Sequence, residues 1–307
     1  MTDIPAARTT PAGPLALGTH DVEIDGLNQR YHVAGNGPVC LAHPGGPGIW
    51  YDYLRMPEAE KHLTMVYVEP VGTGGSDRLP SHPDGYTLDR YVRALDGLRE
   101  HLSLPRVYLL GHSHGGFVAQ RYAITHPDRL AGIILYASSA RTGPEWAAAA
   151  GQALEKWAAQ HAGDPERKSV LTAWETVASL ADDEDCTRAV RGLIPFYTVG
   201  YWRDKRTWKG YLESLRCAYV RETNPDGSPL QAPFLDDREA LRALTVPALI
   251  VAGQYDPILG TRWGRELADL IPDSTVAEFA HSGHLAHLEQ PAEFADAVSR
   301  FAGKTHR

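Results

Sequence analysis

The sequence predicts an α/β fold in which helices cover both faces of a mostly parallel sheet and a helical segment is inserted. Short apolar segments of strand length alternate with helical patterns over residues 38–136, which is typical of a parallel sheet. Residues 141–234 show no clear strand, and the strand pattern returns at 246–252 and 275–279. Two strands are too few for a second sheet, which favours an insertion over a second sequential domain.

Each element follows from a local pattern. Residues 22–33 alternate and are split by Asp25-Gly26, which predicts a hairpin. Apolar residues at helical spacing over 88–98 predict a helix with Thr87 as its N-cap. The other predicted strands are residues 38–42, 64–68, 106–110 and 132–136, and the other predicted helices cover residues 115–124, 145–161, 169–180 and 294–301.

The chain is therefore expected to have three parts. Residues 1–18 form a flexible arm rich in Pro, Ala and Thr, residues 19–140 and 235–307 form the α/β core, and residues 141–234 form a helical cap. The arm lacks the basic start and apolar core of a secretion signal. No apolar run approaches the roughly 20 residues of a membrane helix. We expect a cytoplasmic protein with no membrane partner.

Composition excludes several function classes. Thirty Lys and Arg residues against 38 Asp and Glu give a net charge of −8, so an overall basic field for nucleic acid is absent. The three cysteines, Cys40, Cys186 and Cys217, are too few for a disulfide framework or a zinc cluster and fit a reducing compartment. We expect no metal, no cofactor and a small-molecule or short-peptide substrate. The oligomeric state stays open.

A candidate nucleophile lies between a predicted strand and a predicted helix. Residues 111–116 read Gly-His-Ser-His-Gly-Gly, which matches the G-x-S-x-G elbow with Ser113 at its centre. Glycines two positions on either side relieve the crowding of so tight a reversal. The helix N-terminus directs its free N–H groups to the same place. The alternative is a Gly-rich turn with an incidental serine. Such a turn would not need to lie between a strand and a helix.

A serine nucleophile needs a base and an acid that orients the base. Asp256 follows the next-to-last strand and His284 follows the last one, and strand carboxyl ends are where such sheets build their sites. Asp256 is the predicted acid and His284 the predicted base. A structural turn aspartate is the alternative for Asp256.

Neighbouring residues compete for both roles. Asp236 and Asp237 precede a predicted helix and are interpreted as N-caps. His281 and His287 flank His284, which is favoured because Gly283 permits a sharp turn directly before it.

The oxyanion requires two backbone N–H donors. His114, the residue after the nucleophile, is predicted to supply one, and the loop after the predicted strand at 38–42 supplies the other. That loop, residues 43–48, reads His-Pro-Gly-Gly-Pro-Gly. Gly46 is the first choice and Gly45 the second, because Pro44 has no N–H. His43 is interpreted as a structural loop histidine.

These segments together resemble the serine α/β-hydrolases, and among them the proline iminopeptidase-like group, over nearly the whole chain after the arm. That group carries an HGGPG loop, a G-x-S-x-G-G elbow, an aspartate loop and a Gly-His terminal loop, matched here by residues 43–48, 111–116, 253–257 and 282–284. The resemblance implies an α/β-hydrolase fold with an inserted helical cap. It also implies acyl transfer to water through a Ser113, His284 and Asp256 triad.

The chain departs from that group at positions that concern its substrate. An extra proline follows His43, and residues 69–72 read Glu-Pro-Val-Gly where the peptidases show Asp-Gln-Arg-Gly. Glu175 in the predicted cap matches the Trp-Glu motif whose glutamate binds the substrate ammonium in that group, so the resemblance implies a substrate-binding role for Glu175. The alternative is that Glu175 pairs with a cation of the cap. Arg216 aligns with the second such glutamate, and a cation there would repel an ammonium.

The preferred function is therefore hydrolysis of a small or mid-sized ester, lactone or amide. A proline iminopeptidase-like N-terminal aminopeptidase is the first alternative. A non-hydrolytic lyase or a ligand-binding protein on the same fold is the second. Haloalkane and epoxide hydrolases are disfavoured because they need a carboxylate where Ser113 stands.

Overall fold

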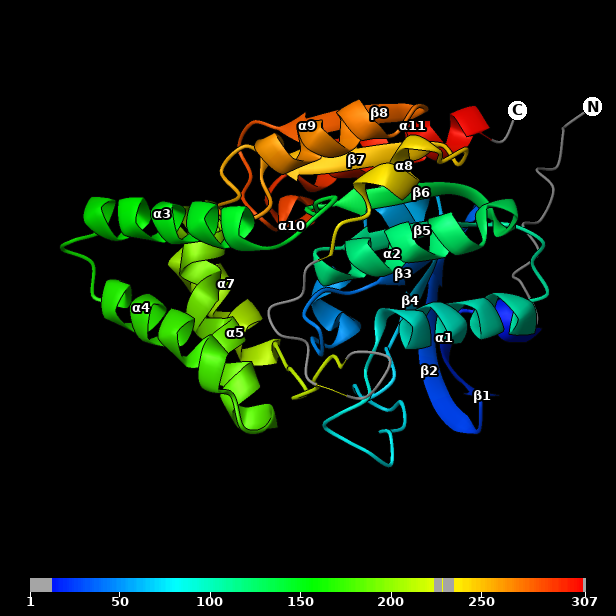
Figure 1. Ribbon diagram of the computed structural model, residues 1–307, viewed down its shortest axis with the longest axis horizontal. Helices are drawn as coiled ribbons and strands as arrows, with labels where there is room; N and C mark the ends of the chain where they lie inside the picture. The colour runs from blue at the N-terminus through cyan, green and yellow to red at the C-terminus, as the bar shows by residue number, and fades with distance from the viewer. Residues whose placement is uncertain (1–12, 224–227, 229–234, 306–307) are drawn as a thin grey trace, which may run out of the picture.

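The computed structural model describes residues 13–223, 228 and 235–305. Its centre is an eight-stranded sheet with the strand order β1-β2-β4-β3-β5-β6-β7-β8 (Figure 1). All pairs from β4 to β8 are parallel, and β2 pairs antiparallel with β1 and β4. The strands are β1 (Gly18–Ile24), β2 (Leu27–Gly35), β3 (Val39–His43), β4 (Thr64–Val68), β5 (Val107–His112), β6 (Leu130–Tyr136), β7 (Ala248–Gly253) and β8 (Ser274–Phe279). The predicted mostly parallel sheet is confirmed.

Two local predictions near the start of the chain are confirmed. The β1–β2 hairpin turns at Asp25 and Gly26, whose φ angles of 52° and 74° suit a two-residue hairpin loop. Helix α1 (Leu88–His101) begins after Thr87, whose side chain accepts a hydrogen bond from the Arg90 N–H. This bond satisfies one of the free donors of the first helical turn.

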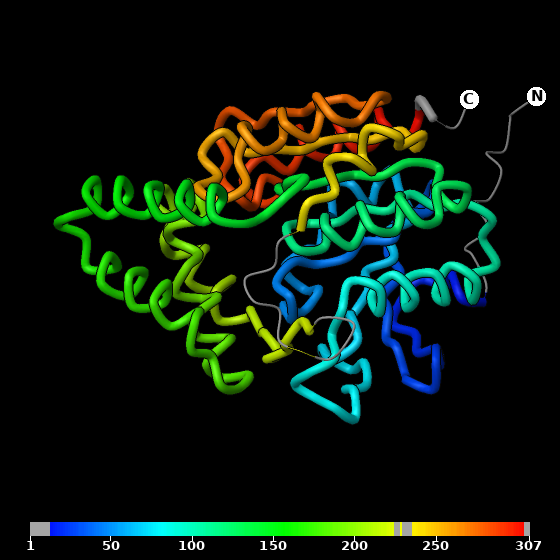
Figure 2. Tube along the Cα trace, viewed as in Figure 1, coloured from blue at the N-terminus to red at the C-terminus, as the bar shows by residue number. Residues whose placement is uncertain are grey.

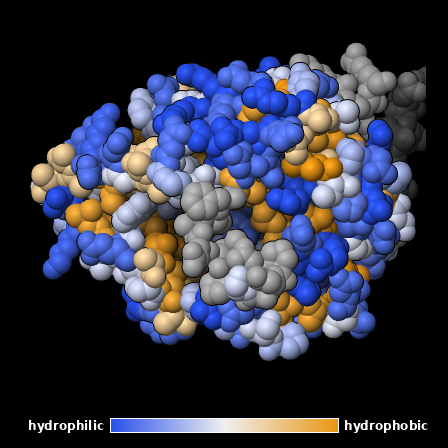
Figure 3. All heavy atoms as spheres, viewed as in Figure 1, coloured by the Kyte–Doolittle hydropathy of each residue, from blue (hydrophilic) through white to orange (hydrophobic). Residues whose placement is uncertain are grey.

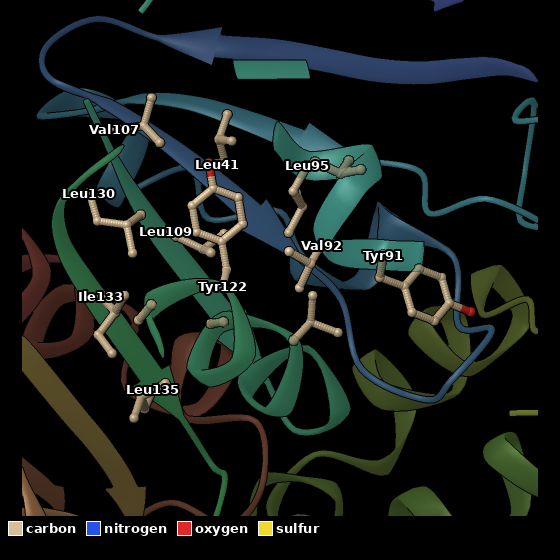
Figure 4. Packing of buried hydrophobic residues seen from close by; sticks show 14 of the residues in the cluster. Leu41, Tyr91, Val92, Leu95, Val107, Leu109, Tyr122, Leu130, Ile133 and Leu135 are labelled. Atoms are coloured by element: carbon tan, nitrogen blue, oxygen red, sulfur yellow. The ribbon is translucent and has the colours of Figure 1, made fainter. Parts of the chain in front are cut away.

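Helices cover both faces of the sheet. One face carries α1, α2 (His114–Thr125), α8 (Arg238–Arg242) and α9 (Thr261–Leu270), and the other carries α11 (Pro291–Thr305) with the short 3₁₀ helices η2 (Tyr51–Leu54) and η3 (Ala59–Lys61). The short helix α10 (Ala286–Glu289) precedes α11. Figure 4 shows the packing on the first face, where α1 and α2 side chains meet those of the strands. Burial of this apolar surface holds the strand ends, and therefore the loops after them, in fixed positions.

Among the described residues, five α-helices between β6 and α8 interrupt the alternation, and we call them the cap helices. They are α3 (Pro144–Gln160), α4 (Glu166–Thr176), α5 (Asp183–Tyr197), α6 (Gly200–Arg203) and α7 (Lys205–Ser214). They lie together beyond one end of the sheet, at the left of Figures 1 and 2. Leu154, Trp157, Val170 and Phe196 give them a small apolar cluster of their own. The last part of the predicted cap, residues 224–227 and 229–234, lies outside the described residues.

Cysteine pairing differs from the expectation. A disulfide joins Cys186 of α5 to Cys217, 31 positions away, and Cys40 is buried and free. The small number of cysteines predicts a reducing compartment, where disulfides are rare. Spacing along the chain could not show the pairing, because only the fold brings the two Cα atoms to 5.5 Å.

The structure describes only part of the predicted N-terminal arm. Residues 1–12 of the predicted arm lie outside the described residues, and the 3₁₀ helix η1 (Gly13–Leu15) and the first residue of β1 follow them. Among the helices that the structure describes, none has the length and apolar character needed to cross a membrane.

Candidate active site

Ser113 lies at the tight reversal between β5 and α2. Its φ of 54° and ψ of −118° place it in a backbone region that side chains rarely adopt, and its N–H donates to the Tyr136 carbonyl at 2.8 Å. A Cβ on Gly111 would lie 2.0 Å from the Gly115 carbonyl oxygen, and a Cβ on Gly115 would lie 2.4 Å from the His43 carbonyl oxygen. Both glycines are therefore required by close backbone approach, as the elbow pattern predicts.

The structure brings the predicted base and acid together. His284 Nδ1 lies 2.7 Å from Asp256 Oδ2, and the Asp256 side chain is fully buried. Asp256 Oδ1 accepts hydrogen bonds from the N–H groups of Ile258 and Leu259, both at 3.0 Å. These two donors fix the orientation of the carboxylate. The arrangement leaves His284 Nε2 as the imidazole nitrogen that can accept a proton.

The rival histidines are not paired with Asp256. His281 is exposed. His287 is buried with Nδ1 3.0 Å from the Tyr136 hydroxyl and Nε2 2.8 Å from the Tyr53 carbonyl oxygen. Burial lowers the pKa of His287 to about 4, so this residue is neutral and structural at physiological pH.

The rival aspartates have other partners. Asp237 occupies the N-cap position of α8 but makes no side-chain cap bond, and its carboxylate pairs with Arg121 at 3.2 Å. Asp236 pairs with Arg238 and weakly accepts the Arg238 N–H at 3.3 Å. The N-cap interpretation therefore holds for the position of Asp237 and for the weak bond from the first helical N–H to Asp236, but an arginine is the main partner of each carboxylate.

The loop after β3 lies beside the nucleophile. Gly45, Gly46 and His114 line the same cavity as Ser113. The Gly45 N–H donates to the Tyr53 hydroxyl at 2.6 Å. Among the described residues, the N–H groups of Gly46 and His114 have no protein acceptor, so both are available to a ligand. The preference for Gly46 over Gly45 thus agrees with the hydrogen bonds.

His43 is held within its own loop. It is 2% exposed, and its Nδ1 lies 2.9 Å from the Pro44 carbonyl oxygen. Burial, with a contribution from the nearby His114, lowers the pKa of His43 to about 3. A neutral, buried imidazole of this kind is structural, as expected.

A cavity of about 750 Å³ joins these residues to the cap helices. Its walls are mainly apolar and include Phe117 of α2, Val190, Leu193 and Tyr197 of α5, and Tyr211 of α7. Val177, after α4, also lines the cavity and is 48% exposed. In Figure 3, apolar side chains reach the surface in the region of the cap helices. The cavity suits a largely apolar substrate of moderate size.

Comparison with known proteins decides the family. A family model described as alpha/beta hydrolase fold matches residues 38–291. The chain belongs to the α/β-hydrolase fold family. Its relatives are hydrolases and peptidases, so the chain is an enzyme of this family. The sequence resemblance to the proline iminopeptidase-like group is confirmed by relatives of that name.

Three similar proteins illustrate the range of this hydrolase family. The chain is 26% identical over 282 residues to a 2-hydroxymuconate semialdehyde hydrolase of Pseudomonas sp. (strain CF600), covering 90% of each chain. It is 26% identical over 288 residues to a proline iminopeptidase of Heyndrickxia coagulans, covering 89% of this chain and 93% of that protein. A solved proline iminopeptidase structure from Mycobacterium smegmatis superposes with a TM-score of 0.68 at 21% identity, covering 94% and 98% of the two chains.

The predicted cap glutamate does not reach the cavity. Glu175 is exposed on α4 and is not part of the cavity wall. Arg216 is also exposed, and its guanidinium donates to the carbonyl oxygens of Glu213 and Leu215. The expected substrate-binding role of Glu175 and the expected repulsion by Arg216 therefore have no basis in the structure, because neither side chain faces the cavity.

A different glutamate lies in the cavity wall. Glu222 Oε1 is 2.6 Å from Nε2 of His114, and the Glu222 side chain is 16% exposed. Among the described cavity-lining residues, Glu222 is the one Asp or Glu and Arg221 is the one Lys or Arg. The guanidinium of Arg221 pairs with Asp84 at the exposed end of the side chain. Sequence reasoning missed Glu222 because it follows no strand and belongs to no motif.

The base loop is anchored to the cap helices. The His284 N–H donates to the Tyr197 carbonyl oxygen at 2.8 Å, and the Gly283 N–H donates to Glu289 Oε2 at 2.7 Å. Glu289 Oε1 accepts the N–H groups of Val199 and Gly200, both at 2.7 Å. Burial raises the pKa of Glu289, and the three backbone donors oppose that shift. These bonds tie the position of His284 to the end of α5.

The described residues contain no group of three or more His, Cys, Asp or Glu side chains arranged to hold a metal ion.

Proposed function

We propose that this chain is a serine hydrolase that cleaves an ester, lactone or amide through an acyl-enzyme on Ser113. His284 Nε2 takes the hydroxyl proton as Ser113 attacks the substrate carbonyl, and Asp256 stabilises the imidazolium that forms. The N–H groups of Gly46 and His114 bind the oxyanion. The imidazolium then protonates the leaving group, and a water activated by His284 releases the acyl group.

One observation carries this proposal more than any other. The Asp256 carboxylate is fully buried, is fixed by two backbone donors and lies 2.7 Å from His284 Nδ1. Burial of a charged group is costly unless it is paired and hydrogen-bonded. His284, the base of this pair, lines the same cavity as Ser113, a serine in a strained elbow, and that combination supports nucleophilic catalysis.

The cavity supports the choice of substrate size. Its volume of about 750 Å³ lies within the usual range for small-molecule sites. The apolar walls favour an uncharged acyl or leaving group, which supports an ester or lactone as the first choice.

A second candidate, an N-terminal aminopeptidase, is favoured by Glu222. This carboxylate is in the cavity wall and contacts His114, the residue next to the nucleophile. A substrate ammonium could replace His114 as its partner and would then lie close to the scissile carbonyl. The relative from Heyndrickxia coagulans carries the name proline iminopeptidase, which adds support for this reading.

Hydrolysis of a substrate panel tests both candidates. p-Nitrophenyl esters of increasing acyl length are compared with prolyl- and alanyl-arylamides, using the wild type and Ser113→Ala. The proposal expects ester turnover that Ser113→Ala abolishes while the thermal unfolding midpoint stays unchanged. Turnover that survives in Ser113→Ala contradicts the acyl-enzyme. Faster cleavage of the arylamides than of every ester favours the peptidase.

Two glutamate variants separate the candidates further. Glu222→Gln removes the cavity carboxylate, whereas Glu175→Gln removes an exposed one from the same chain. If an ammonium binds Glu222, the first variant raises KM for alanyl-arylamide by about tenfold, the scale of a lost charge-assisted bond. The second variant leaves that KM unchanged. An equal effect of both variants, or none, removes the support that Glu222 gives to the peptidase.

A further inference from the structure

Three loops of the site are joined by a chain of buried hydrogen bonds. The Gly45 N–H of the loop after β3 donates to the Tyr53 hydroxyl at 2.6 Å. The Tyr53 hydroxyl lies 2.6 Å from His112 Nδ1, and His112 Nε2 lies 3.0 Å from the His284 carbonyl oxygen. His112 directly precedes Ser113. This series of hydrogen bonds therefore connects the loop after β3 (residues 43–48, the oxyanion loop), the nucleophile elbow (residues 111–116) and the loop that carries His284 (residues 280–285, the base loop).

The direction of each hydrogen bond follows from the acceptors. The His284 carbonyl oxygen can only accept, so Nε2 of His112 carries the proton that it receives. Burial and the neighbouring histidines hold the pKa of His112 well below its usual range, so the ring is neutral and Nδ1 has no proton. The Tyr53 hydroxyl therefore donates to Nδ1 of His112 and accepts from the Gly45 N–H. Each polar group in this series of hydrogen bonds has a partner.

This arrangement limits what Tyr53 can do. Its ring lines the substrate cavity, but its only proton is held by His112, so the hydroxyl has none to offer an oxyanion. Its oxygen instead fixes a loop that lies very close to the nucleophile. A Cβ on Gly45 would be 3.0 Å from the Ser113 Cβ. A displacement of well under 1 Å in this loop would alter the contact with the reacting atoms.

We propose that Tyr53 and His112 are positioning residues that hold the oxyanion loop and the base loop at fixed distances from Ser113. The inference rests on the proposed hydrolase function, because it concerns the placement of the groups assigned there. Preorganised donors stabilise a transition state only when they are already in place. Loss of the Tyr53 hydroxyl should therefore lower the rate of the chemical step more than substrate binding.

The chain offers a matched control for Tyr53→Phe. Tyr67 is also fully buried, and its hydroxyl accepts the Met56 N–H at 2.9 Å and donates to Glu60 Oε1 at 2.8 Å. Tyr67→Phe therefore removes the same kind of hydroxyl, with one backbone donor and one acceptor. Neither of its partners belongs to the three loops of the site.

The test measures kcat, KM and amide exchange in both variants, with the p-nitrophenyl ester that the wild type cleaves fastest. Tyr53→Phe is expected to lower kcat by tenfold or more, in the range of a misplaced catalytic donor, while KM changes less than threefold. The Gly45 amide should exchange faster in Tyr53→Phe only. Tyr67→Phe should keep the wild-type kcat.

Two results would overturn the inference while leaving the hydrolase intact. One is a wild-type kcat and wild-type Gly45 exchange in Tyr53→Phe. The other is an equal fall of kcat in Tyr67→Phe, which would assign the effect to general loss of stability. Absence of any Ser113-dependent turnover in the wild type is a separate outcome, because it contradicts the proposed function itself. Thermal unfolding of each variant verifies that it is folded at the assay temperature.

Discussion

Substitution of Asp256 by asparagine tests how the acid acts on the base. In the wild type, Asp256 Oδ1 accepts two backbone N–H groups and Oδ2 faces His284 Nδ1. The same two donors hold the amide oxygen of an asparagine in place, because the reverse orientation would set its NH₂ group against two N–H groups. The asparagine NH₂ then faces His284 Nδ1 and donates to it.

The expected magnitude follows from this reversal. With Nδ1 as an acceptor, the imidazole carries its proton on Nε2, which is the nitrogen that must accept the Ser113 proton. The wrong tautomer should lower kcat by about 10⁴-fold, or about 5.5 kcal/mol of transition-state stabilisation. The hydrogen bonds to the backbone persist, so the thermal unfolding midpoint should change little.

A sensitive ester assay with Asp256→Asn and Asp237→Asn measures this effect. Asp237 is a buried carboxylate like Asp256, but it pairs with Arg121 and does not contact His284. Asp237→Asn should therefore keep kcat near the wild-type value. The reasoning is refuted if Asp256→Asn keeps more than a tenth of the wild-type kcat, or if both variants lose activity equally.

Other predictions concern stability. Gly283→Ala should destabilise the fold by about 1–3 kcal/mol, because its Cβ would lie 2.2 Å from the Tyr197 carbonyl oxygen. Gly210→Ala in α7, whose Cβ meets nothing within 4 Å, should stabilise it by about 0.5–1 kcal/mol; urea denaturation showing the opposite order would contradict both. His43 and His287, with pKa values of about 3 and about 4, stay neutral when folded, whereas the unfolded chain binds their protons below about pH 6.5. The free energy of unfolding should thus fall between pH 7 and pH 5 by about 2 kcal/mol for each histidine, and an unchanged urea midpoint would count against their burial.

The core could be predicted because its patterns are local. The predicted strand at residues 64–68 coincides with β4 (Thr64–Val68), because a short, mainly apolar run bounded by turn residues is typical of a buried strand. Helix α9 (Thr261–Leu270) was missed, although Trp263, Leu267 and Leu270 are spaced at helical intervals and are buried. The bounds of the cap helix α5 (Asp183–Tyr197) were also missed, although Cys186, Ala189 and Leu193 are spaced at helical intervals and are buried.

Some residues of the candidate site could likewise be predicted from local patterns, and others could not. Asp256 and His284 could be selected because they follow strands, and the topology of a parallel sheet brings strand ends together. Tyr53 and Glu222 could not, since each enters the site from a loop or short helix placed only by tertiary contacts. Glu175 shows the opposite error, in which a residue is wrongly assigned to the site. The motif match predicted a side chain in the cavity, whereas the structure exposes it on α4.

Covalent labelling of the nucleophile tests the central claim most directly. A fluorophosphonate reacts with a serine only when a base activates it, and the labelled peptide is identified by mass spectrometry after digestion. The wild type is expected to carry one adduct, on Ser113, and His284→Ala is expected to lose nearly all labelling while His281→Ala keeps it. A well-folded wild type without an adduct, or an adduct on another serine, would contradict the assignment of Ser113 as an activated nucleophile.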